Sequence, residues 1–309
     1  MTTRFEAPLV AWYRASARDL PWRRPGVPAW SILVSEFMLQ QTPVSRVLPA
    51  HESWLARWPT APDLAAATPA DAVRQWGRLG YPRRALRLHA CAQAITSSHG
   101  GGVPESLGEL RALPGVGAYT AAAVASFAFG QRHPVLDTNV RRVLARLLTG
   151  NELAAPSSAS VAETALAESL LPPADGRRAA TWSVAVMELG ALVCTARRPA
   201  CELCPVASDC AWLLRGSPPR SARRVTQRYE GSDRQCRGAL LAVLRNAAGP
   251  IPQTALEVCW PDPAQRARVL AALLADGLAE ASGNGMIGLP GEARADLSLV
   301  PARDWPPHG

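Results

Sequence analysis

The sequence predicts an all-helical protein followed by a small C-terminal domain that adds a β-hairpin. Apolar residues recur at helical spacing, and strand-like alternation is nearly absent before residue 278. Residues 216–232 instead contain mainly Gly, Ser, Pro, Arg and Gln, a composition typical of an exposed linker. We therefore expect a helical domain over 1–215, a linker over 216–232, a second domain over 233–290 and a loose tail over 291–309.

The helices of the first domain are placed where apolar side chains repeat every three to four residues. Between them lie short stretches with Gly, Pro or Asp, which favour turns. The expected helices are Phe5–Ser16, Ala29–Gln40, Pro43–Trp58, Asp63–Ala67, Pro69–Gly77, Arg83–His99, Leu107–Ala112, Ala118–Phe129, Thr138–Leu148, Ser157–Leu170, Arg177–Thr195 and a short turn at Ala207–Leu214.

The second domain has the pattern of a winged helix. Three short helices are expected at Asp233–Asn246, Gln253–Val258 and Asp262–Ala275. They precede two apolar runs, Leu278–Ala281 and Met286–Leu289, around a Gly-Asn-Gly turn that is typical of a hairpin. Winged helices are relatives of the helix-turn-helix, and such a domain either binds DNA or serves as a packing module.

Composition narrows the class of protein. The 309 residues are 48% hydrophobic, which is enough for true cores and excludes disorder as the main character. We find no secretory leader at Met1–Asp19, and the longest weakly polar run, Ala118–Gly130, is too short to span a bilayer. A cytoplasmic protein without membrane contact is expected. Its net charge of +8 favours a polyanionic partner such as nucleic acid.

All 33 residues counted as Lys+Arg are arginine, because the chain contains no lysine. A GC-rich genome would account for the origin of this bias. Its chemical consequence is that no lysine side chain is available to form a Schiff base.

Four cysteines lie within seventeen residues, with the spacing Cys194-x6-Cys201-x2-Cys204-x5-Cys210. In a protein expected to be cytoplasmic, such a cluster indicates metal binding rather than disulfides. Zinc ribbons pair two short knuckles, whereas here one short gap is flanked by longer ones, a spacing that favours an iron–sulfur cluster over zinc.

Leu113-Pro114-Gly115-Val116-Gly117 joins two expected helices. Gly115 and Gly117 let the backbone turn sharply and expose amide N–H groups at the start of the next helix, where the helix dipole favours an anion. Alone, this is either a tight turn or a phosphate grip. The order of a helix-hairpin-helix, then an aspartate, then four clustered cysteines strengthens the second interpretation.

Six segments, taken in order, resemble the adenine DNA glycosylases of the MutY type. The resemblance covers residues 1–215 and implies a two-lobed helix-hairpin-helix glycosylase with a [4Fe-4S] cluster, which kinks DNA and receives a flipped base. The segments are Leu20-Pro21-Trp22-Arg23, Ser35-Glu36-Phe37-Met38-Leu39-Gln40-Gln41-Thr42, Leu79-Gly80-Tyr81, Leu113-Pro114-Gly115-Val116-Gly117, Asp137-Thr138-Asn139-Val140, and Met187-Glu188-Leu189-Gly190 leading into the cysteine loop.

Two carboxylates are the candidate catalytic groups. Glu36 lies in an apolar helix where desolvation would keep it protonated, although a solvated helix-surface position is the ordinary alternative. Asp137 precedes an expected helix and would ordinarily be its N-cap. The resemblance implies that Glu36 protonates N7 of adenine and that Asp137 stabilises or transiently captures the sugar cation, with Asn139 and Tyr119 positioning these groups and the water.

Position 119 separates two related classes of glycosylase. Endonuclease III-type enzymes resemble this chain but carry a lysine nucleophile where it has Tyr119. The resemblance therefore implies a glycosylase without lysine-dependent lyase activity. Two alternatives remain, an endonuclease III-like glycosylase and a non-catalytic iron–sulfur DNA-binding regulator.

The resemblance also assigns residues to DNA and to the adenine pocket. Duplex DNA with adenine opposite 8-oxoguanine or guanine is the implied partner, and a monomer is expected. Many relatives end in a larger domain that reads 8-oxoguanine through a Phe-Ser-His loop, which this chain lacks. Candidate DNA contacts are Gln41, Thr42, Leu79, Tyr81, Arg83, Arg84, Arg197 and Arg198 beside the two hairpin glycines, and candidate pocket residues are Trp22, Arg23 and Met38.

Overall fold

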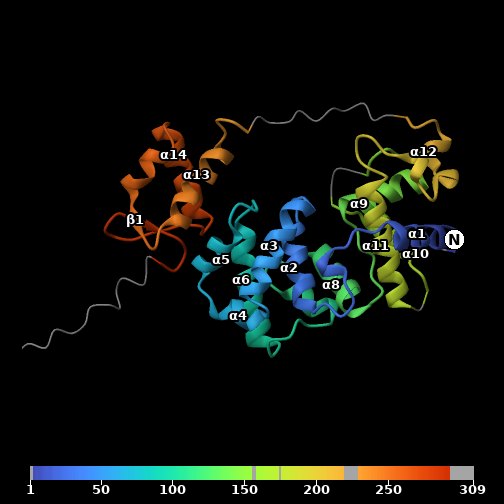
Figure 1. Cartoon of the computed structure of the whole chain (residues 1–309), viewed down its shortest axis with the longest axis horizontal. Coiled ribbons are helices and arrows are strands. Elements are labelled where there is room, and N and C mark those ends of the chain that lie inside the picture. The colour runs from blue at the N-terminus through green and yellow to red at the C-terminus, as the bar shows by residue number, and fades with distance from the viewer. Residues whose placement is uncertain (1–2, 155–157, 174, 219–228, 293–309) are drawn as a thin grey trace, which may run out of the picture. The chain divides into compact units, whose positions relative to one another are not determined.

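The computed structural model describes residues 3–154, 158–173, 175–218 and 229–292. The protein divides into two compact units, each made of two separate stretches of chain (Figure 1). Unit 1 contains residues 1–40 and 102–224, and unit 2 contains residues 41–101 and 225–309. Most of the expected linker, the tail from residue 293 and the expected helix start at Ser157 lie outside the described residues.

Unit 1 is helical, as expected, and three helix pairs build it. α2 packs on α8, α9 packs on α11, and α1 packs on α11. The elements are α1 (Thr3–Ser16), η1 (Pro21–Arg23), α2 (Ala29–Leu39), α7 (Leu107–Ala112), α8 (Ala118–Phe129), α9 (Thr138–Leu144), a π-helical turn η2 (Ala145–Thr149), α10 (Val161–Ser169), α11 (Gly176–Leu192), η3 (Cys201–Leu203), η4 (Ala207–Asp209) and α12 (Ala211–Leu214).

The α2–α8 pair is the most apolar part of unit 1. Every residue of α2 from Trp30 to Met38 is buried, including the polar Ser31, Ser35 and Glu36. α8 meets it with small buried side chains, Ala121 to Ala125 among them, which let two helices approach closely. In the described part of the chain, no helix combines the length and apolar character needed to cross a membrane.

α9 and α11 approach each other closely at Gly190 of α11. A Cβ placed on Gly190 would lie 2.7 Å from the Cβ of Asn139, so only glycine permits this approach. α9 begins at its N-cap Asp137 and continues into η2, which ends at Gly150 in the left-handed conformation. The helix expected over Thr138–Leu148 is therefore present, but its last turn is a π-turn.

Unit 2 begins with four helices, two of which start with a capping box. Thr60 with Asp63 and Thr68 with Asp71 exchange hydrogen bonds at the first turns of α4 and α5. Trp54 packs edge-on against both Trp58 and Trp76 in the core. The helices are α3 (Val44–Arg57), α4 (Ala61–Ala66), α5 (Pro69–Trp76) and α6 (Arg83–Ser98).

The C-terminal part of unit 2 has the winged-helix pattern with one strand more than expected. The expected hairpin forms, and the additional strand β1 pairs antiparallel with β3, giving the order β1-β3-β2. Two residues, Ile251 and Pro252, make up β1, and so short a run carries no alternation in the sequence. The elements are α13 (Asp233–Asn246), β1 (Ile251–Pro252), η5 (Gln253–Cys259), α14 (Pro263–Ala275), β2 (Glu280–Ala281) and β3 (Met286–Gly288).

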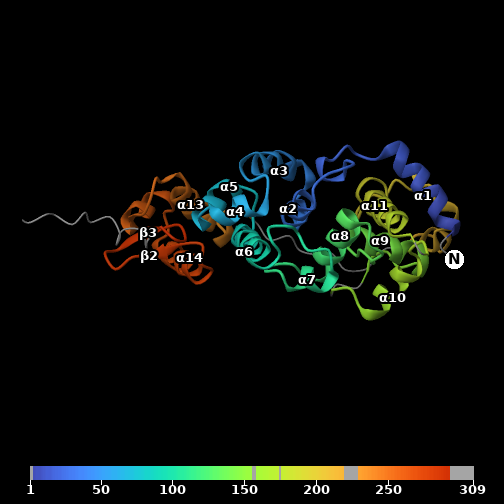
Figure 2. The same cartoon turned by 90° about the horizontal axis from the view of Figure 1, so that it is seen from below.

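Of the C-terminal helices, α13 packs on α5 within unit 2 (Figures 1 and 2). Arg245 Nε donates to the carbonyl of Val73 at 3.0 Å, and Arg74 Nη2 donates to the carbonyl of Ala247 at 3.2 Å. Arg74 also forms an ion pair with Glu292. Residues 233–292 therefore share a core unit with residues 41–101, a grouping that differs from the expected separate domain.

Candidate active site

Glu36 lies on α2 inside unit 1, with 5% of its surface exposed. Burial raises its pKa to about 7, against a hydrogen bond from Tyr119 that lowers it, while the charge of Asp137 raises it and that of Arg23 lowers it. Burial likewise raises the pKa of Tyr119 far above its ordinary value, so its hydroxyl stays protonated and can donate to Glu36. Glu36 therefore holds its proton in a substantial fraction of molecules at neutral pH.

Asp137 is both the N-cap of α9 and a neighbour of Glu36. Its Oδ1 accepts from the backbone N–H of Val140 at 2.6 Å, and its Oδ2 accepts from Asn139 Nδ2 at 2.9 Å. Burial raises the pKa of Asp137, whereas these hydrogen bonds lower it. Asp137 therefore has two roles: it caps α9, and it places a carboxylate beside Glu36.

Asn139 is oriented from its other side by Arg142. Arg142 Nη2 donates to Asn139 Oδ1 at 2.8 Å and to the carbonyl of Gly190 at 2.6 Å, and its Nε donates to the carbonyl of Cys194 at 2.8 Å. The short approach at Gly190 makes these bonds possible. The amide of Asn139 therefore has a fixed orientation, with its NH₂ toward Asp137.

A buried ion-pair group, which the sequence reasoning missed, lies next to this pair of carboxylates. Glu188 has no exposed surface and accepts from Arg18 Nε and Nη2, both at 2.7 Å, and from Arg23 Nη1 at 2.8 Å. Burial alone would favour the neutral acid, but the two arginines lower the pKa of Glu188 to about 2. A single glutamate inside the apolar run Val184–Val193 was the available signal.

The three candidate pocket residues differ in exposure. Trp22 and Met38 are buried side chains of unit 1, whereas Arg23 is partly exposed and bonded to Glu188. Because the charge of Arg23 acts on Glu36, the arginine lies within electrostatic reach of the candidate acid. Glu36, Tyr119, Asp137, Asn139 and Arg23 are therefore grouped in one unit.

The hairpin between α7 and α8 presents its glycines at the surface. Gly115 has φ +77°, a left-handed conformation in which glycine is favoured, and the backbone N–H of Val116 closes the turn onto the carbonyl of Leu113. Gly117 is the N-cap of α8. The first amides of α8 consequently lie beside exposed backbone, as an anion-binding turn requires.

The four clustered cysteines lie in a loop closed by η3 and η4. Their charges act on one another when ionised, and burial raises the pKa of Cys204 to about 11. Arg146, a buried guanidinium, donates to Cys194 Sγ at 3.3 Å and to the carbonyl of Thr195 at 2.8 Å, which ties the start of the loop to η2. In the part of the chain that the structure describes, no three such side chains converge on one mononuclear metal site. The four thiols do lie within electrostatic reach of one another in one loop, so these residues fit the ligand set of a four-iron cluster.

Two exposed residues of unit 2, Gln41 and Tyr81, have left-handed backbone conformations with φ 55° and 47°. Tyr81 is 56% exposed, whereas its expected companions Thr42 and Leu79 are buried. Arg84 is also buried, which does not fit the surface phosphate contact expected for it. Its guanidinium instead donates to Thr42 and to the carbonyl of Gly80 inside unit 2. Of the remaining arginines, Arg83 forms an ion pair with Asp276, and Arg197 and Arg198 are exposed.

The C-terminal domain offers fewer free arginines than its sequence suggests. Arg237 pairs with Asp276, Arg268 pairs with Asp233 at 2.8 Å, and Arg266 donates to the carbonyl of Trp260 at 2.6 Å. These guanidinium groups stabilise the domain itself. Arg234, by contrast, is exposed on α13.

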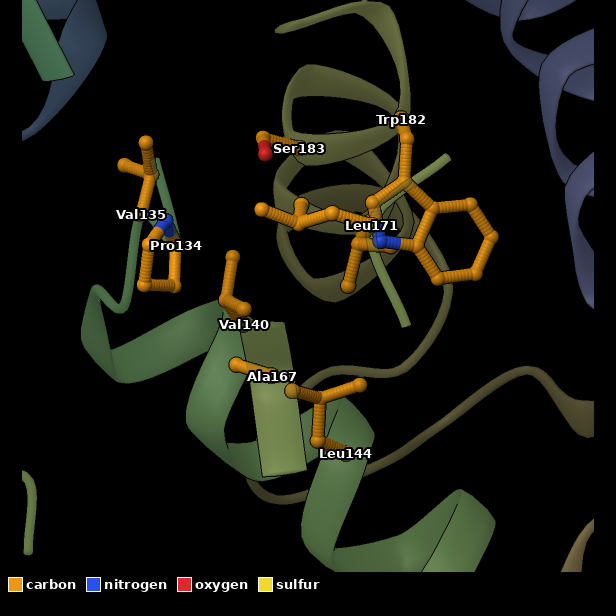
Figure 3. A pocket seen from close by; sticks show the side chains of 9 residues that line it. Pro134, Val135, Val140, Leu144, Ala167, Leu171, Trp182 and Ser183 are labelled. Carbon is orange, nitrogen blue, oxygen red and sulfur yellow. The ribbon is translucent and has the colours of Figure 1, made fainter. Parts of the chain in front are cut away.

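One small pocket lies in the core of unit 1, beneath the helix that Asp137 caps (Figure 3). Ser183 provides its one side-chain hydroxyl, and no titratable side chain lines it. The pocket therefore supplies packing rather than chemistry. Its lining is Pro134, Val135, Val140, Leu144, Ala167, Leu171, Trp182, Ser183 and Val186.

Comparison with known proteins identifies the family. An adenine DNA glycosylase of Mycolicibacterium smegmatis is 54% identical over 285 residues, which is 92% of this chain and 95% of that protein. The chain belongs to the adenine DNA glycosylase family. The human adenine DNA glycosylase is 43% identical over 218 residues, covering 67% of this chain and 39% of the human protein.

Family models and solved structures agree with membership in the adenine DNA glycosylase family. Residues 34–169 match the HhH-GPD superfamily of base excision DNA repair proteins, and residues 194–210 match the iron–sulfur binding domain of endonuclease III. A thermostable thymine-DNA glycosylase superposes with a TM-score of 0.63 at 26% identity, over 69% of this chain and 97% of that one. These matches confirm the expected helix-hairpin-helix fold and [4Fe-4S] cluster, and they favour the iron–sulfur interpretation of the four cysteines over zinc.

The match to endonuclease III bound to DNA concerns the fold. That chain superposes with a TM-score of 0.58 at 21% identity, over 70% of this chain and 98% of that one. Family membership and the superfamily match make the protein a DNA glycosylase of base excision repair, and the endonuclease III match shows that its fold is shared more widely.

Proposed function

We propose that the protein is a monofunctional adenine DNA glycosylase that acts, as a monomer, on adenine opposite 8-oxoguanine or guanine in duplex DNA. The observation that carries the proposal is Glu36, a buried acid with a pKa of about 7 that lies beside a second carboxylate. The 54% identity with an adenine DNA glycosylase supports adenine as the base.

Glu36 supplies the proton that the leaving base needs. Its near-neutral pKa matches the general acid of a reaction run at neutral pH. The carboxyl protonates N7 of adenine, so the base departs as a neutral molecule when the N-glycosidic bond breaks. Tyr119, which hydrogen-bonds to Glu36, keeps the carboxyl in one orientation.

Asp137 acts on the sugar. As the glycosidic bond breaks, positive charge develops on the sugar ring, and a nearby carboxylate stabilises it. The hydrogen bonds from Val140 and Asn139 hold Asp137 in place and favour its ionised form. Water then adds to the sugar cation and gives up a proton to the Glu36 carboxylate, which restores the acid and leaves an abasic site.

The reaction ends at the abasic site because the chain has no lysine to form an imine with the opened sugar. Position 119, where the endonuclease III type carries its lysine, is a tyrosine already bonded to Glu36. A lyase step on the DNA strand is therefore not part of the proposed reaction.

DNA contacts are proposed at exposed groups of both units. In unit 1 these are the backbone amides at Gly115 and Gly117 and the guanidinium groups of Arg197 and Arg198. Cys194, Cys201, Cys204 and Cys210 would hold the cluster, and the iron–thiolate bonds would order the loop that carries the two arginines. In unit 2 the exposed Gln41 and Tyr81 enter the base stack beside the flipped adenine.

A paired-substrate assay tests the proposal. We expect adenine release from a duplex with adenine opposite 8-oxoguanine, no release of thymine glycol from a second duplex, and no covalent product after borohydride treatment. Thymine glycol release would indicate an endonuclease III-like enzyme. Duplex binding without base release would indicate a regulator, and efficient borohydride trapping would contradict the monofunctional reaction.

A further inference from the structure

Two exposed loops of unit 2 share an unusual backbone feature. Of the described non-glycine residues, only Gln41, Tyr81 and Ser217 have positive φ. The Gln41 loop (residues 41–43) leads into α3, and the Tyr81 loop (residues 77–82) leads into α6. Side chains disfavour this conformation, so the surrounding structure must impose it.

One buried side chain connects both loops. Arg84 is 5% exposed, and its Nη2 donates to Thr42 Oγ1 at 2.8 Å in the first loop and to the carbonyl of Gly80 at 3.0 Å in the second. The backbone N–H of Arg84 donates to the carbonyl of Tyr81 at 3.0 Å. The same guanidinium therefore fixes the distance between the residues that follow Gln41 and precede Tyr81.

Aromatic rings complete this arrangement. The guanidinium carbon of Arg84 lies 5.2 Å from the centre of the Trp76 ring and 5.3 Å from that of Tyr81. Trp76 Nε1 also donates to the carbonyl of Gly80, at 2.9 Å. Burial lowers the pKa of Arg84 to about 10, which leaves it charged at neutral pH, so the cation–π contact with Tyr81 persists.

An arginine is suited to this place because its planar head offers several donors in a fixed fork while its faces stack on rings. Lysine has a compact ammonium group and no planar face. A phosphate ligand, by comparison, would need an exposed head. Arg87, three residues further along α6, is exposed.

We propose that Arg84 is a positioning residue that holds Gln41 and Tyr81 in the orientation needed to discriminate the base opposite the adenine. The inference rests on the proposed function, since it needs a duplex with a mispair. Arg84 acts through the two loops and makes no contact with phosphate or with the reacting atoms.

The test compares Arg84→Gln and Arg84→Lys with the matched control Arg87→Gln. Single-turnover rates of adenine release are measured on duplexes with 8-oxoguanine or guanine opposite the adenine. We expect both Arg84 variants to lower the ratio of the two rates by about tenfold or more, since a small misplacement has large effects, while the control leaves the ratio unchanged. An unchanged ratio in folded Arg84→Gln, or full rescue by lysine, would overturn the proposal.

Salt dependence separates positioning from phosphate binding. Losing one phosphate contact reduces the slope of log affinity against log salt by about 1. We expect Arg84→Gln to leave this slope unchanged on an undamaged duplex. A slope reduced by about 1 would make Arg84 a phosphate ligand instead.

Thr42→Val keeps the test decisive if the Arg84 variants do not fold. It removes the hydroxyl that accepts from Arg84 and preserves the shape of the side chain, so we expect a smaller fall in the same ratio. Fluorescence of 2-aminopurine placed beside the opposite base reports insertion on binding, independent of chemistry. If the variants lose this signal but the wild-type protein releases no adenine, the proposed function is wrong and the positioning role stands. If the variants give the same signal as the wild type, the positioning role is wrong.

Discussion

Glu36 and Asp137 are both buried carboxyl groups, yet their surroundings assign them different tasks. Glu36 has an apolar helix around it and one hydrogen bond from a tyrosine, so its pKa rises to about 7. Burial raises the pKa of Asp137 as well, but the two hydrogen bonds that its carboxylate accepts at the start of α9 oppose this rise and favour the charged form. Position in the fold, rather than residue type, thus separates the acid from the anion.

Replacing the acid should remove chemistry and keep binding. Glu36→Gln preserves the shape of the side chain but cannot protonate adenine, so we expect base release to slow by about 100-fold or more with unchanged duplex affinity. In the wild type, single-turnover release should fall as pH rises above about 7, where Glu36 loses its proton. Glu168→Gln, a change at an exposed glutamate, serves as the control. Near-normal release by Glu36→Gln would reject the assignment.

Glu188 matters to stability because it balances two arginines in the interior. Glu188→Gln leaves Arg18 and Arg23 without a counter-charge, and we expect the free energy of unfolding to fall by about 2 kcal/mol. The loss is smaller than for a fully buried ion pair because the Arg18 side chain is partly exposed to water. Urea unfolding measures this loss, and Glu168→Gln should cost less than about 1 kcal/mol.

The pH dependence of the same comparison has a definite sign. The folded pKa of Glu188, about 2, lies below its ordinary value of 4.5. Its stabilising contribution is therefore complete above pH 4.5 and is lost as pH falls toward about 2. The difference in stability between the wild type and Glu188→Gln should shrink over this interval. A difference that grows on acidification would contradict the ion-pair account.

Helices were the elements that the sequence predicted best, because each unit's helices carry a clear apolar period. Leu107–Ala112, Ala118–Phe129 and Asp233–Asn246 have the bounds predicted for them. The π-turn after Leu144 and the two-residue strand β1 were not predictable. Both depend on tertiary partners: Arg146 must reach the cysteine loop, and Ile251 must meet Ile287.

The four cysteines of the loop 194–210 determine which metal the protein should contain. Purified without oxygen, the protein should contain about four irons per chain and little zinc. The Cys201→Ser variant should lose iron, and its loop 194–210 should become sensitive to proteases. Its affinity for DNA should fall more than its rate of base release from bound DNA. Cys236→Ala, a change outside the loop, should keep the iron. Full iron content in Cys201→Ser would exclude that residue as a ligand.

The grouping of chain segments into units is the feature that no local pattern could supply. The motifs for the catalytic carboxylates and the cysteine loop were readable because their chemistry needs particular residues at particular spacings. Glu188 with its two arginines, and Arg245 bonded to Val73, join residues about 170 positions apart. Such pairs become visible only in three dimensions, and they explain why residues 233–292 belong with residues 41–101.

Removing the C-terminal residues 232–309 tests what they contribute. We expect unit 1 to keep its cluster and adenine release to persist, whereas the preference for 8-oxoguanine over guanine should fall. Unit 2 should also unfold more easily, because α5 loses its contacts with Arg245 and Glu292. Arg234→Gln in the full chain tests the exposed arginine separately. An unchanged rate ratio after truncation would make the domain a packing module.

The division of unit 1 into two stretches affects how the protein is made. During synthesis, α1 and the apolar α2 leave the ribosome first, but their partners α8 and α11 lie beyond residues 41–101. Until those partners emerge, the nine residues Trp30–Met38 have nothing to cover them. The nascent chain therefore exposes an apolar helix while the first stretch of unit 2, residues 41–101, is translated, which makes it a substrate for chaperones that bind growing chains.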